Sequence, residues 1–377
     1  MRLAALAILV ACTLALGACA DEDMVAGVPG GGASAAPAPV PGGRELRDVE
    51  GWINSEPRTI AGELAANRVV LVDFWTYTCV NCIRTLPFLE AWHERYAALG
   101  LTIIGVHTPE FEFEHHRPNV LAAVERYGLR YPVVQDNDYE TWDAFENRFW
   151  PAKYLLVPGR GVSYEHFGEG DYQETEHAIR AALERLGRDL SAVPLVEVKP
   201  PAVEASEAAR QTAELYGGYR RNFSARGGFA GQEEYYLEPD VSRTYVDRGE
   251  RTPNKWYLSG EWLNEPEAIV HNRRAANFED YIALRFRGRS VNVVLRPEGR
   301  QPFEVVVEID GKPLTPSEVG ADVTLTAEGR SIIEVREARL YNVVQLDRFE
   351  ERDLTLRANS LDFAVYAFTF GSYTEGP

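Results

Sequence analysis

Two cysteines, Cys79 and Cys82, lie two residues apart directly after an apolar run. The run from Val69 to Trp75 is typical of a buried strand, and apolar residues recur at roughly helical spacing from Leu86 to Tyr96. The cysteines therefore precede or begin a helix, where unpaired backbone N–H groups and the helix dipole stabilise negative charge. A thiolate on Cys79 is favoured there, and Cys82 is close enough to form a disulfide with it. The spacing indicates thiol–disulfide exchange.

Two structural roles for the same pair remain open. A zinc site would need two more ligands, and the sequence has no second Cys-x-x-Cys motif. A purely structural disulfide between cysteines this close would close a very short loop and add little stability. Redox chemistry is the better interpretation of the pair, and it implies no cofactor.

The composition is that of an acidic chain long enough for two domains, with 377 residues and a net charge of −18. The negative charge argues against a nucleic acid partner. Met1 and Arg2 precede an apolar run from Leu3 to Leu16, which is typical of a secretory signal and too short for a membrane span.

The end of this signal, Leu16-Gly17-Ala18-Cys19, resembles a bacterial lipobox. That resemblance implies that residues 1–19 form a lipoprotein signal peptide, that Cys19 is lipidated, and that Cys12 is removed with the signal. An ordinary cleaved signal with an incidental Cys19 is the alternative. Residues 20–43 are rich in Gly, Ala and Pro and predict a flexible tether. We therefore expect an extracytoplasmic, membrane-anchored lipoprotein on the periplasmic or outer face of the envelope.

Residues 44–188 alternate between predicted strands and helices. The runs 69–75 and 101–107 predict parallel strands joined by the cysteine-bearing helix. The runs 152–157 and 162–167 flank a Pro-Gly turn signal and predict a hairpin. Further helices are expected at residues 119–127, 139–148 and 175–186. This pattern favours an α/β domain built on the thioredoxin plan, with a mixed sheet and helices on both faces.

Several short stretches of this domain resemble the thioredoxin superfamily. The resemblance is carried by Val72-Asp73-Phe74-Trp75 before the cysteines, by Pro87 in the following helix, and by Trp150-Pro151 before the hairpin. Within the superfamily, the chain is similar to TlpA-like thiol–disulfide oxidoreductases, and most closely to the extracytoplasmic thioredoxin-like module of DipZ-type proteins. The stretches that carry this finer similarity are residues 76–79, 105–110, 147–152 and 167–170.

The resemblance implies roles for three catalytic residues. Cys79 would be the attacking thiol and Cys82 the resolving thiol. Asp73 would be a buried carboxylate that accepts the proton of Cys82, which requires a pKa raised by desolvation. A partly solvated, structural Asp73 is the alternative.

The resemblance also implies a substrate-binding edge. Pro151 matches the cis-proline that lies against the disulfide, and with Trp150 and Thr78 it would contact an extended substrate. An ordinary trans-proline that opens a strand is the alternative. Thr78 is itself a departure, because many relatives have Trp before the first cysteine.

Two further positions depart from the family pattern. Asn81 stands where Pro is common, and Thr85 stands where some relatives place an acidic residue near the active site. Residues between the cysteines tune thiolate stability, so a reduction potential cannot be transferred from the family. Glu110 is a substitute candidate for the acidic residue.

A thiol peroxidase of the redoxin or AhpC/TSA type is one rival chemistry. Thr76-x-x-Cys79 echoes the Thr-x-x-Cys of peroxiredoxins, whose cysteine attacks peroxide. The upstream proline of that family is replaced by Val72, and a resolving cysteine two residues away is unusual there.

Copper delivery, as in Sco-like thioredoxin folds, is the other rival chemistry. It would use the two cysteines and one of the histidines at positions 107, 115 and 116. The cysteine spacing is shorter than in that family, and loop histidines are more often solvated than metal-bound. We therefore expect no metal.

After a Pro- and Val-rich linker at residues 189–211, the pattern changes to short strands without helices. This predicts an antiparallel β-sandwich over residues 212–377, which resembles the domain that follows DipZ-like modules. It contains no cysteine and no plausible catalytic constellation. Trp256, Tyr257 and Trp262 could form a platform for a carbohydrate or protein ligand, or else belong to the core.

These observations together predict a membrane-tethered reductase of protein disulfides. TlpA-like relatives receive electrons from a membrane thiol carrier of the CcdA or DsbD type, so a separate donor of that type is implied as a partner. The alternative is an envelope binding protein in which the β-sandwich binds the ligand and the cysteine pair is a structural disulfide.

Overall fold

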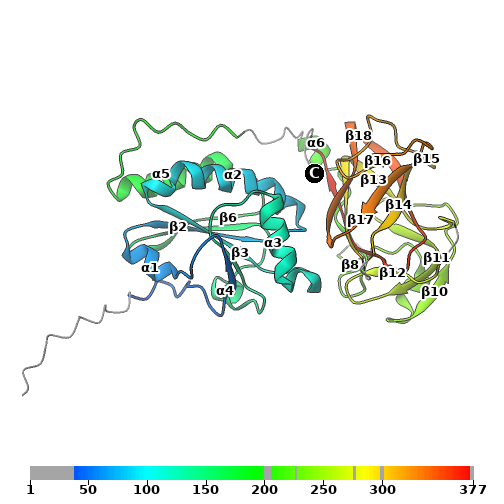
Figure 1. Cartoon of the computed structure of the whole chain (residues 1–377), viewed down its shortest axis with the longest axis horizontal. Coiled ribbons are helices and arrows are strands. Elements are labelled where there is room, and N and C mark those ends of the chain that lie inside the picture. The colour runs from blue at the N-terminus through cyan, green and yellow to red at the C-terminus, as the bar shows by residue number, and fades with distance from the viewer. Residues whose placement is uncertain (1–37, 199–204, 226, 275–276, 298–300, 374–377) are drawn as a thin grey trace, which may run out of the picture. The chain divides into compact units, whose positions relative to one another are not determined.

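The structure is a computed structural model that describes residues 38–198, 205–225, 227–274, 277–297 and 301–373. The predicted signal peptide, Cys19 and most of the predicted tether lie outside these residues. Within them, no helix combines the length and apolar character that crossing a membrane requires. The described residues form an α/β domain followed by an all-β domain, as the sequence predicts (Figure 1).

A six-stranded mixed sheet forms the centre of the first domain, with the strand order β1-β4-β3-β2-β5-β6. Its strands are β1 (Glu50–Ile53), β2 (Val69–Trp75), β3 (Leu101–His107), β4 (Val133–Gln135), β5 (Ala152–Val157) and β6 (Gly161–Phe167). Strand β2 runs parallel to β3 and antiparallel to β5, and β5 pairs antiparallel with β6. The predicted strand–helix–strand unit and the predicted hairpin are both present.

Helices cover both faces of this sheet (Figure 1). One face carries α2 (Val80–Tyr96), α3 (Arg117–Arg126) and α5 (Tyr172–Arg185), and the other carries α1 (Ile60–Ala65) and α4 (Glu140–Ala144). Two short 3-10 helices, η1 (Ala97–Leu99) and η2 (Glu112–His115), follow α2 and β3. Helix α4 is shorter than the sequence predicts, because Tyr139 and Glu146 on either side of it have positive φ angles of 63° and 54°.

The second domain is one large antiparallel sheet, with the main strand order β10-β11-β12-β19-β13-β18-β14-β17-β16. Short β7 and β15 pair with β19 and β14, and β8 pairs separately with β9. The bounds of the elements from the linker onward are α6 (Ala205–Ala208), β7 (Leu215–Tyr216), β8 (Phe223–Ser224), β9 (Gly227–Gly228), η3 (Glu233–Tyr236), β10 (Ser242–Tyr245), β11 (Trp256–Asn264), β12 (Ile269–His271), β13 (Asp280–Pro297), β14 (Phe303–Ile309), β15 (Lys312–Pro313), β16 (Thr324–Leu325), β17 (Ser331–Val335), β18 (Arg339–Ala358) and β19 (Phe363–Gly371).

Of the two alternatives for the aromatic residues of this domain, a ligand platform or the core, the core is the correct one. Trp256 and Trp262 are 0% exposed and Tyr257 is 8% exposed, so all three belong to the interior. Trp256 and Trp262 pack among the apolar side chains of the β domain. Their indole N–H groups donate to backbone oxygens, of Tyr216 and Ser259 respectively. Buried rings with satisfied polar atoms cannot stack on a ligand.

Candidate active site

Cys79 occupies the N-cap position of helix α2. Its backbone is extended (φ −76°, ψ 111°), and its Sγ atom accepts a hydrogen bond from the backbone N–H of Cys82 at 3.3 Å. The side chain is half-buried, and neither cysteine is in a disulfide. The Cys79 sulfur thus accepts a hydrogen bond at the N-terminus of α2 and remains partly exposed.

Cys82 lies one turn further along α2 and is completely buried among the apolar side chains between α2 and the sheet. Burial raises the pKa of its thiol well above the usual value, and the nearby Cys79 and Asp73 raise it further. At neutral pH this cysteine is therefore a thiol, and a base must remove its proton before it can act as a nucleophile.

Asp73 lies in the middle of β2, on the face that α2 covers. Because side chains alternate along a strand, Asp73 shares this face with Leu71 and Trp75, which pack in the same apolar cluster as Cys82. Its side chain is 0% exposed, and neither carboxylate oxygen has a hydrogen-bond partner among the described residues. Burial raises its pKa from 3.8 to about 7, against an opposing effect of Lys153.

Lys153 is a site residue that the sequence analysis missed. It is the Cα partner of Asp73 across the β2–β5 pair and is 0% exposed. Its Nζ atom donates to the backbone oxygen of Gly168 at 3.3 Å, and burial lowers its pKa. A lysine within the otherwise apolar run of β5 is the signal that could have identified it, because buried lysines need a charged or polar partner.

The predicted substrate-binding residues lie on two loops. The Trp150–Pro151 peptide bond is cis, and the indole N–H of Trp150 donates to the backbone oxygen of Thr108 at 3.1 Å. Thr78 is 2% exposed as a whole residue, and its hydroxyl donates to Glu114, so the structure does not present it to a substrate.

Glu110, the candidate for an acidic residue near the cysteines, is paired elsewhere, and a second carboxyl group, Glu114, contacts the residue before Cys79. Glu110 forms an ion pair with Arg221 at 2.5 Å, and it accepts a hydrogen bond from Tyr216 Oη. Glu114 is 0% exposed and accepts a hydrogen bond of 2.6 Å from the hydroxyl of Thr78, the residue before Cys79. A glutamate three residues after the start of a short helix, where it can reach back to backbone N–H groups, is the signal for this position.

His107, one of the three histidines considered for copper, lies in the core of the α/β domain. His107 is 0% exposed, its ring packs against Trp75 and Tyr77, and burial lowers its pKa to about 3. In the part of the chain that the structure describes, no group of three or more His, Cys, Asp or Glu side chains is arranged to hold a metal ion.

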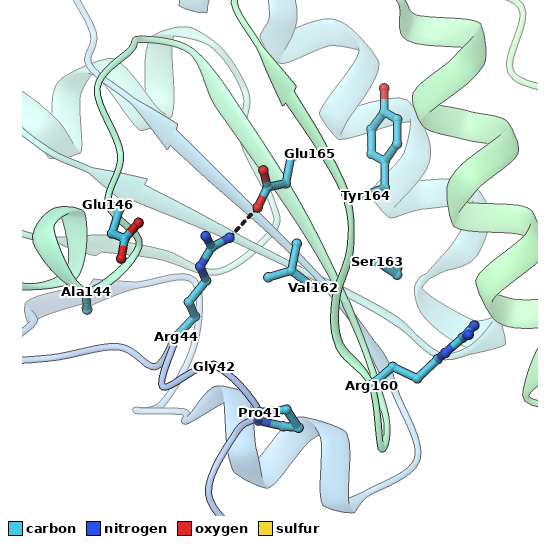
Figure 2. Close-up of a pocket in the computed structure, with 10 residues that line it drawn as sticks. All are labelled: Pro41, Gly42, Arg44, Ala144, Glu146, Arg160, Val162, Ser163, Tyr164 and Glu165. Atoms are coloured by element: carbon cyan, nitrogen blue, oxygen red, sulfur yellow. Dashed lines mark hydrogen bonds and ion pairs between the residues drawn. The ribbon is translucent and has the colours of Figure 1, made fainter.

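A hollow of about 590 Å³ lies apart from the cysteines, beside the β5–β6 hairpin. Figure 2 shows Arg44 and Glu165 pointing toward each other across it, where they form an ion pair. None of its lining residues belongs to the predicted site.

Comparisons with known proteins agree with this geometry. Residues 47–164 match the model of the AhpC/TSA family, and residues 212–371 match the model of the thioredoxin like C-terminal domain. The protein DipZ of Mycobacterium tuberculosis is 30% identical over 335 residues, which are 87% of this chain and 42% of DipZ. The chain thus spans less than half the length of this relative.

Two smaller relatives and one solved structure extend the comparison. The thiol–disulfide oxidoreductases YkuV of Bacillus subtilis and ResA of Halalkalibacterium halodurans are 26% and 32% identical over 30% and 33% of this chain, covering 74% and 64% of their own lengths. A putative thiol:disulfide interchange protein DsbE from Chlorobium tepidum is 20% identical, with a TM-score of 0.31, over 33% of this chain and 86% of that chain. The chain is thus similar to DipZ over most of its own length, and its α/β domain is similar to thiol–disulfide oxidoreductases such as ResA and YkuV.

Proposed function

We propose that this chain is a thiol–disulfide oxidoreductase that reduces disulfide bonds in proteins. The observation that carries the proposal is the difference between its two cysteines. Cys79 is half-buried, at a helix N-terminus that favours the thiolate, whereas Cys82 is buried directly behind it. A reachable nucleophile and a protected second thiol on the same helix turn are what a two-step exchange needs.

The first step is attack of the Cys79 thiolate on one sulfur of a substrate disulfide. A bond forms between Cys79 Sγ and that sulfur, the substrate S–S bond breaks, and the other substrate sulfur leaves as a thiolate that takes a proton from water. In the second step Cys82 attacks Cys79 Sγ, which releases the second substrate thiolate. The two electrons of the dithiol have then passed to the substrate, and the enzyme holds a disulfide between its cysteines.

Asp73 is the proposed proton acceptor in the second step. Cys82 must lose its proton as it attacks, and its raised pKa prevents it from doing so unaided. A carboxylate with a pKa of about 7 and no other hydrogen-bond donor on its oxygens is suited to accept this proton. Lys153, on the neighbouring strand, would offset the charge of the ionised carboxylate.

An extended segment of the substrate is proposed to lie along the edge formed by Trp150 and Pro151, without Thr78, which is buried. The proposal is supported by the half-buried Trp150 side chain, which the backbone oxygen of Thr108 holds in place. Protein disulfides are the substrate class that fits, because an extended backbone can bind at such an edge independently of its side chains.

The proposed location is outside the cytoplasm, with a lipid on Cys19 that anchors the chain to a membrane. The support is the lipobox-like sequence and the following Gly- and Pro-rich segment. Electrons would come from a membrane thiol donor of the CcdA or DsbD type. Replacing Cys19 with Ser should move the protein from the membrane pellet to the soluble fraction after cell lysis. If the variant stayed in the pellet, the anchor would lie elsewhere.

The test of the reaction is insulin reduction by the full chain with dithiothreitol as the electron source. Cys79→Ser should abolish activity, because no nucleophile remains at the surface. Reduced Cys82→Ser, mixed with insulin after the dithiothreitol has been removed, should accumulate a mixed disulfide with the substrate, because resolution is blocked. The mixed disulfide should be visible as a mass increase that reducing agent removes.

Cys19→Ser is the matched control, since it also removes a thiol but leaves the proposed redox pair intact. It should reduce insulin as the unmodified protein does. Full activity in Cys79→Ser would show that the proposed reaction is wrong, whatever the result with the control.

A thiol peroxidase remains the second candidate, because residues 47–164 match the AhpC/TSA family model. Thr76 is the residue that the motif shares with peroxiredoxins. In the structure its Oγ1 atom lies 3.4 Å from His107 Nε2. Hydrogen peroxide consumption, coupled to dithiothreitol oxidation, separates the candidates. Peroxide turnover faster than insulin reduction would favour the peroxidase.

A further inference from the structure

Glu114 is a buried carboxyl group that the proposed exchange reaction does not use. It lies on the short helix η2 and is 0% exposed, although glutamate side chains are almost never fully buried unless they are paired. Glu114 contacts Thr78, the residue before the proposed nucleophile Cys79. Oε1 accepts a hydrogen bond of 2.6 Å from the hydroxyl of Thr78, which is itself 2% exposed.

The second oxygen of Glu114 is bound by the backbone. Its Oε2 atom accepts hydrogen bonds from the N–H groups of Glu110 at 2.5 Å and Phe111 at 3.1 Å. With the Thr78 hydroxyl, three donors point at the two oxygens, and the hydroxyl of Thr76 faces the same carboxyl group. This is the arrangement that an ionised carboxylate requires. Only the two hydroxyl groups can change direction, since a backbone N–H cannot become an acceptor. Thr78, with its hydrogen bond of 2.6 Å, is the partner through which a proton added to Glu114 reaches the residue before Cys79.

We propose that Glu114 is a positioning residue for Cys79, and that the proton on its carboxyl group controls the reactivity of Cys79 through the Thr78 hydroxyl. This inference rests on the proposed thiol–disulfide exchange. When Glu114 is ionised, Thr78 donates to it and the turn before Cys79 is fixed. When Glu114 is protonated, its O–H donates to Thr78 Oγ1, and the Thr78 hydroxyl hydrogen turns to another acceptor.

The charge of Glu114 has a second effect on Cys79. Like charges disfavour each other's ionised forms, so an ionised Glu114 opposes a thiolate on Cys79 and a neutral Glu114 does not. The groups facing Glu114 do not cancel this effect. Tyr77 and Tyr139 are neutral, with raised pKa values, and the nearby charge of Glu110 is already paired with Arg221. Burial, followed by the charge of Glu110, raises the pKa of Glu114 from 4.5 to about 7, so the proton is exchanged near neutral pH.

The test is the rate of Cys79 alkylation by iodoacetamide between pH 5 and 9.5, measured on the reduced full chain by mass spectrometry. Cys82 is buried and should react only slowly. Glu114→Gln mimics the protonated carboxyl, because its oxygen can accept the backbone N–H bonds while its NH₂ group donates to Thr78. We expect its alkylation midpoint to lie lower than that of the unmodified protein by about 0.5 to 1 pH unit.

The matched control is Glu112→Gln, which removes a carboxyl from the same helix. The Glu112 side chain is 81% exposed, so its neutralisation should leave the alkylation profile unchanged. Thr78→Val tests the route through the hydroxyl. If coupling passes through Thr78, adding Glu114→Gln to Thr78→Val should give less than half of the shift that it gives alone.

The inference is overturned if folded Glu114→Gln has the same alkylation profile as the unmodified protein, or if Glu112→Gln shifts it equally. A full shift in the Thr78→Val background would overturn the route through Thr78. Alkylation of Cys79 does not require turnover of a substrate. The alkylation result therefore tests the role of Glu114 independently of the proposed function. If insulin reduction failed while the shift was present, the proposed function alone would be wrong.

Discussion

Two buried carboxyl groups flank the cysteine pair, and they differ in what surrounds their oxygens. Asp73 lies behind Cys82 with no hydrogen-bond partner on either oxygen, whereas Glu114 lies beside Thr78 with three donors. Burial raises the pKa of both groups to about 7. The same pKa therefore arises in two environments, one dry and unpaired, the other fully hydrogen-bonded.

The difference teaches that the pKa alone does not define the role of a buried acid. An unpaired carboxylate can accept a proton without breaking any existing hydrogen bond, which suits Asp73 to proton transfer. A carboxylate held by three donors is fixed in space, and its protonation forces a neighbour to rearrange. Glu114 is thus suited to positioning, and each prediction below tests one side of this contrast.

The largest expected effect is on the pH dependence of stability at Asp73. The native state holds the Asp73 proton more tightly than the unfolded state, since the pKa is about 7 instead of 3.8. Stability should therefore fall as pH rises from about 4 to about 7, by up to about 4 kcal/mol. Asp73→Asn should remove this fall and make the protein more stable at pH 8, but not at pH 3.5.

The measurement is the urea concentration at which the buried Cys82 becomes accessible to 2,2′-dithiodipyridine, a reagent that still reacts with thiols at pH 3.5, because this reports on the α/β domain alone. Ile103→Val, at a buried apolar residue on the neighbouring strand β3, serves as a control for substitution in this sheet. Equal changes in stability at pH 3.5 and pH 8 for Asp73→Asn would mean that this carboxyl does not titrate in that interval.

Glu114→Ala should lower the stability of the protein at pH 8, whereas Asp73→Asn should raise it. It leaves the N–H groups of Glu110 and Phe111 and the hydroxyl of Thr78 without an acceptor in a buried site. Unsatisfied buried donors destabilise a protein by about 1 to 3 kcal/mol each, so we expect a loss of about 3 kcal/mol at pH 8. The same urea measurement applies. A variant as stable as the unmodified protein would show that these hydrogen bonds are replaced by water.

Removing the proton acceptor should slow the resolving step. In Asp73→Asn the mixed disulfide should form at the normal rate but decay about 100-fold more slowly, which is at the low end of general-base effects. Quenched-flow mass spectrometry with an insulin-derived disulfide measures both steps. Glu114→Gln is the comparison, because it should alter formation and leave decay unchanged. Slower formation of the mixed disulfide in Asp73→Asn would contradict the proposal, because it would show that Asp73 acts in the first step.

Much of the fold could be predicted from the sequence where the signal is local. The runs at 69–75, 101–107 and 152–157 form strands with the predicted bounds, because they are mostly apolar segments buried on both faces. The strands of the all-β domain were harder to predict. Residues 280–297 and 339–358 each form one long strand instead of the short strands that the sequence predicts, since register shifts allow the strands to continue through their polar middles.

The site divides in the same way. Cys79, Cys82 and Asp73 lie within ten consecutive residues, so a short motif is enough to identify them. Glu114 and Thr78 are 36 residues apart in the sequence, and they meet only because η2 directs the Glu114 side chain inward. Lys153 likewise depends on the register between β2 and β5. Residues assembled by tertiary structure have no local pattern to reveal them.

The smallest expected effect tests the partner of Asp73. Lys153 lowers the pKa of Asp73 by its positive charge, against the larger effect of burial. Lys153→Met keeps the length and apolar stem of the side chain but removes the charge, so the pKa of Asp73 should rise. The pH midpoint of the resolving step should then move upward by about 1 pH unit. Lys312→Met, at an exposed position in the other domain, is the control and should leave the midpoint unchanged. A midpoint that did not move would mean that the charge of Lys153 does not affect the pKa of Asp73. Burial alone would then account for the raised pKa of this carboxyl group.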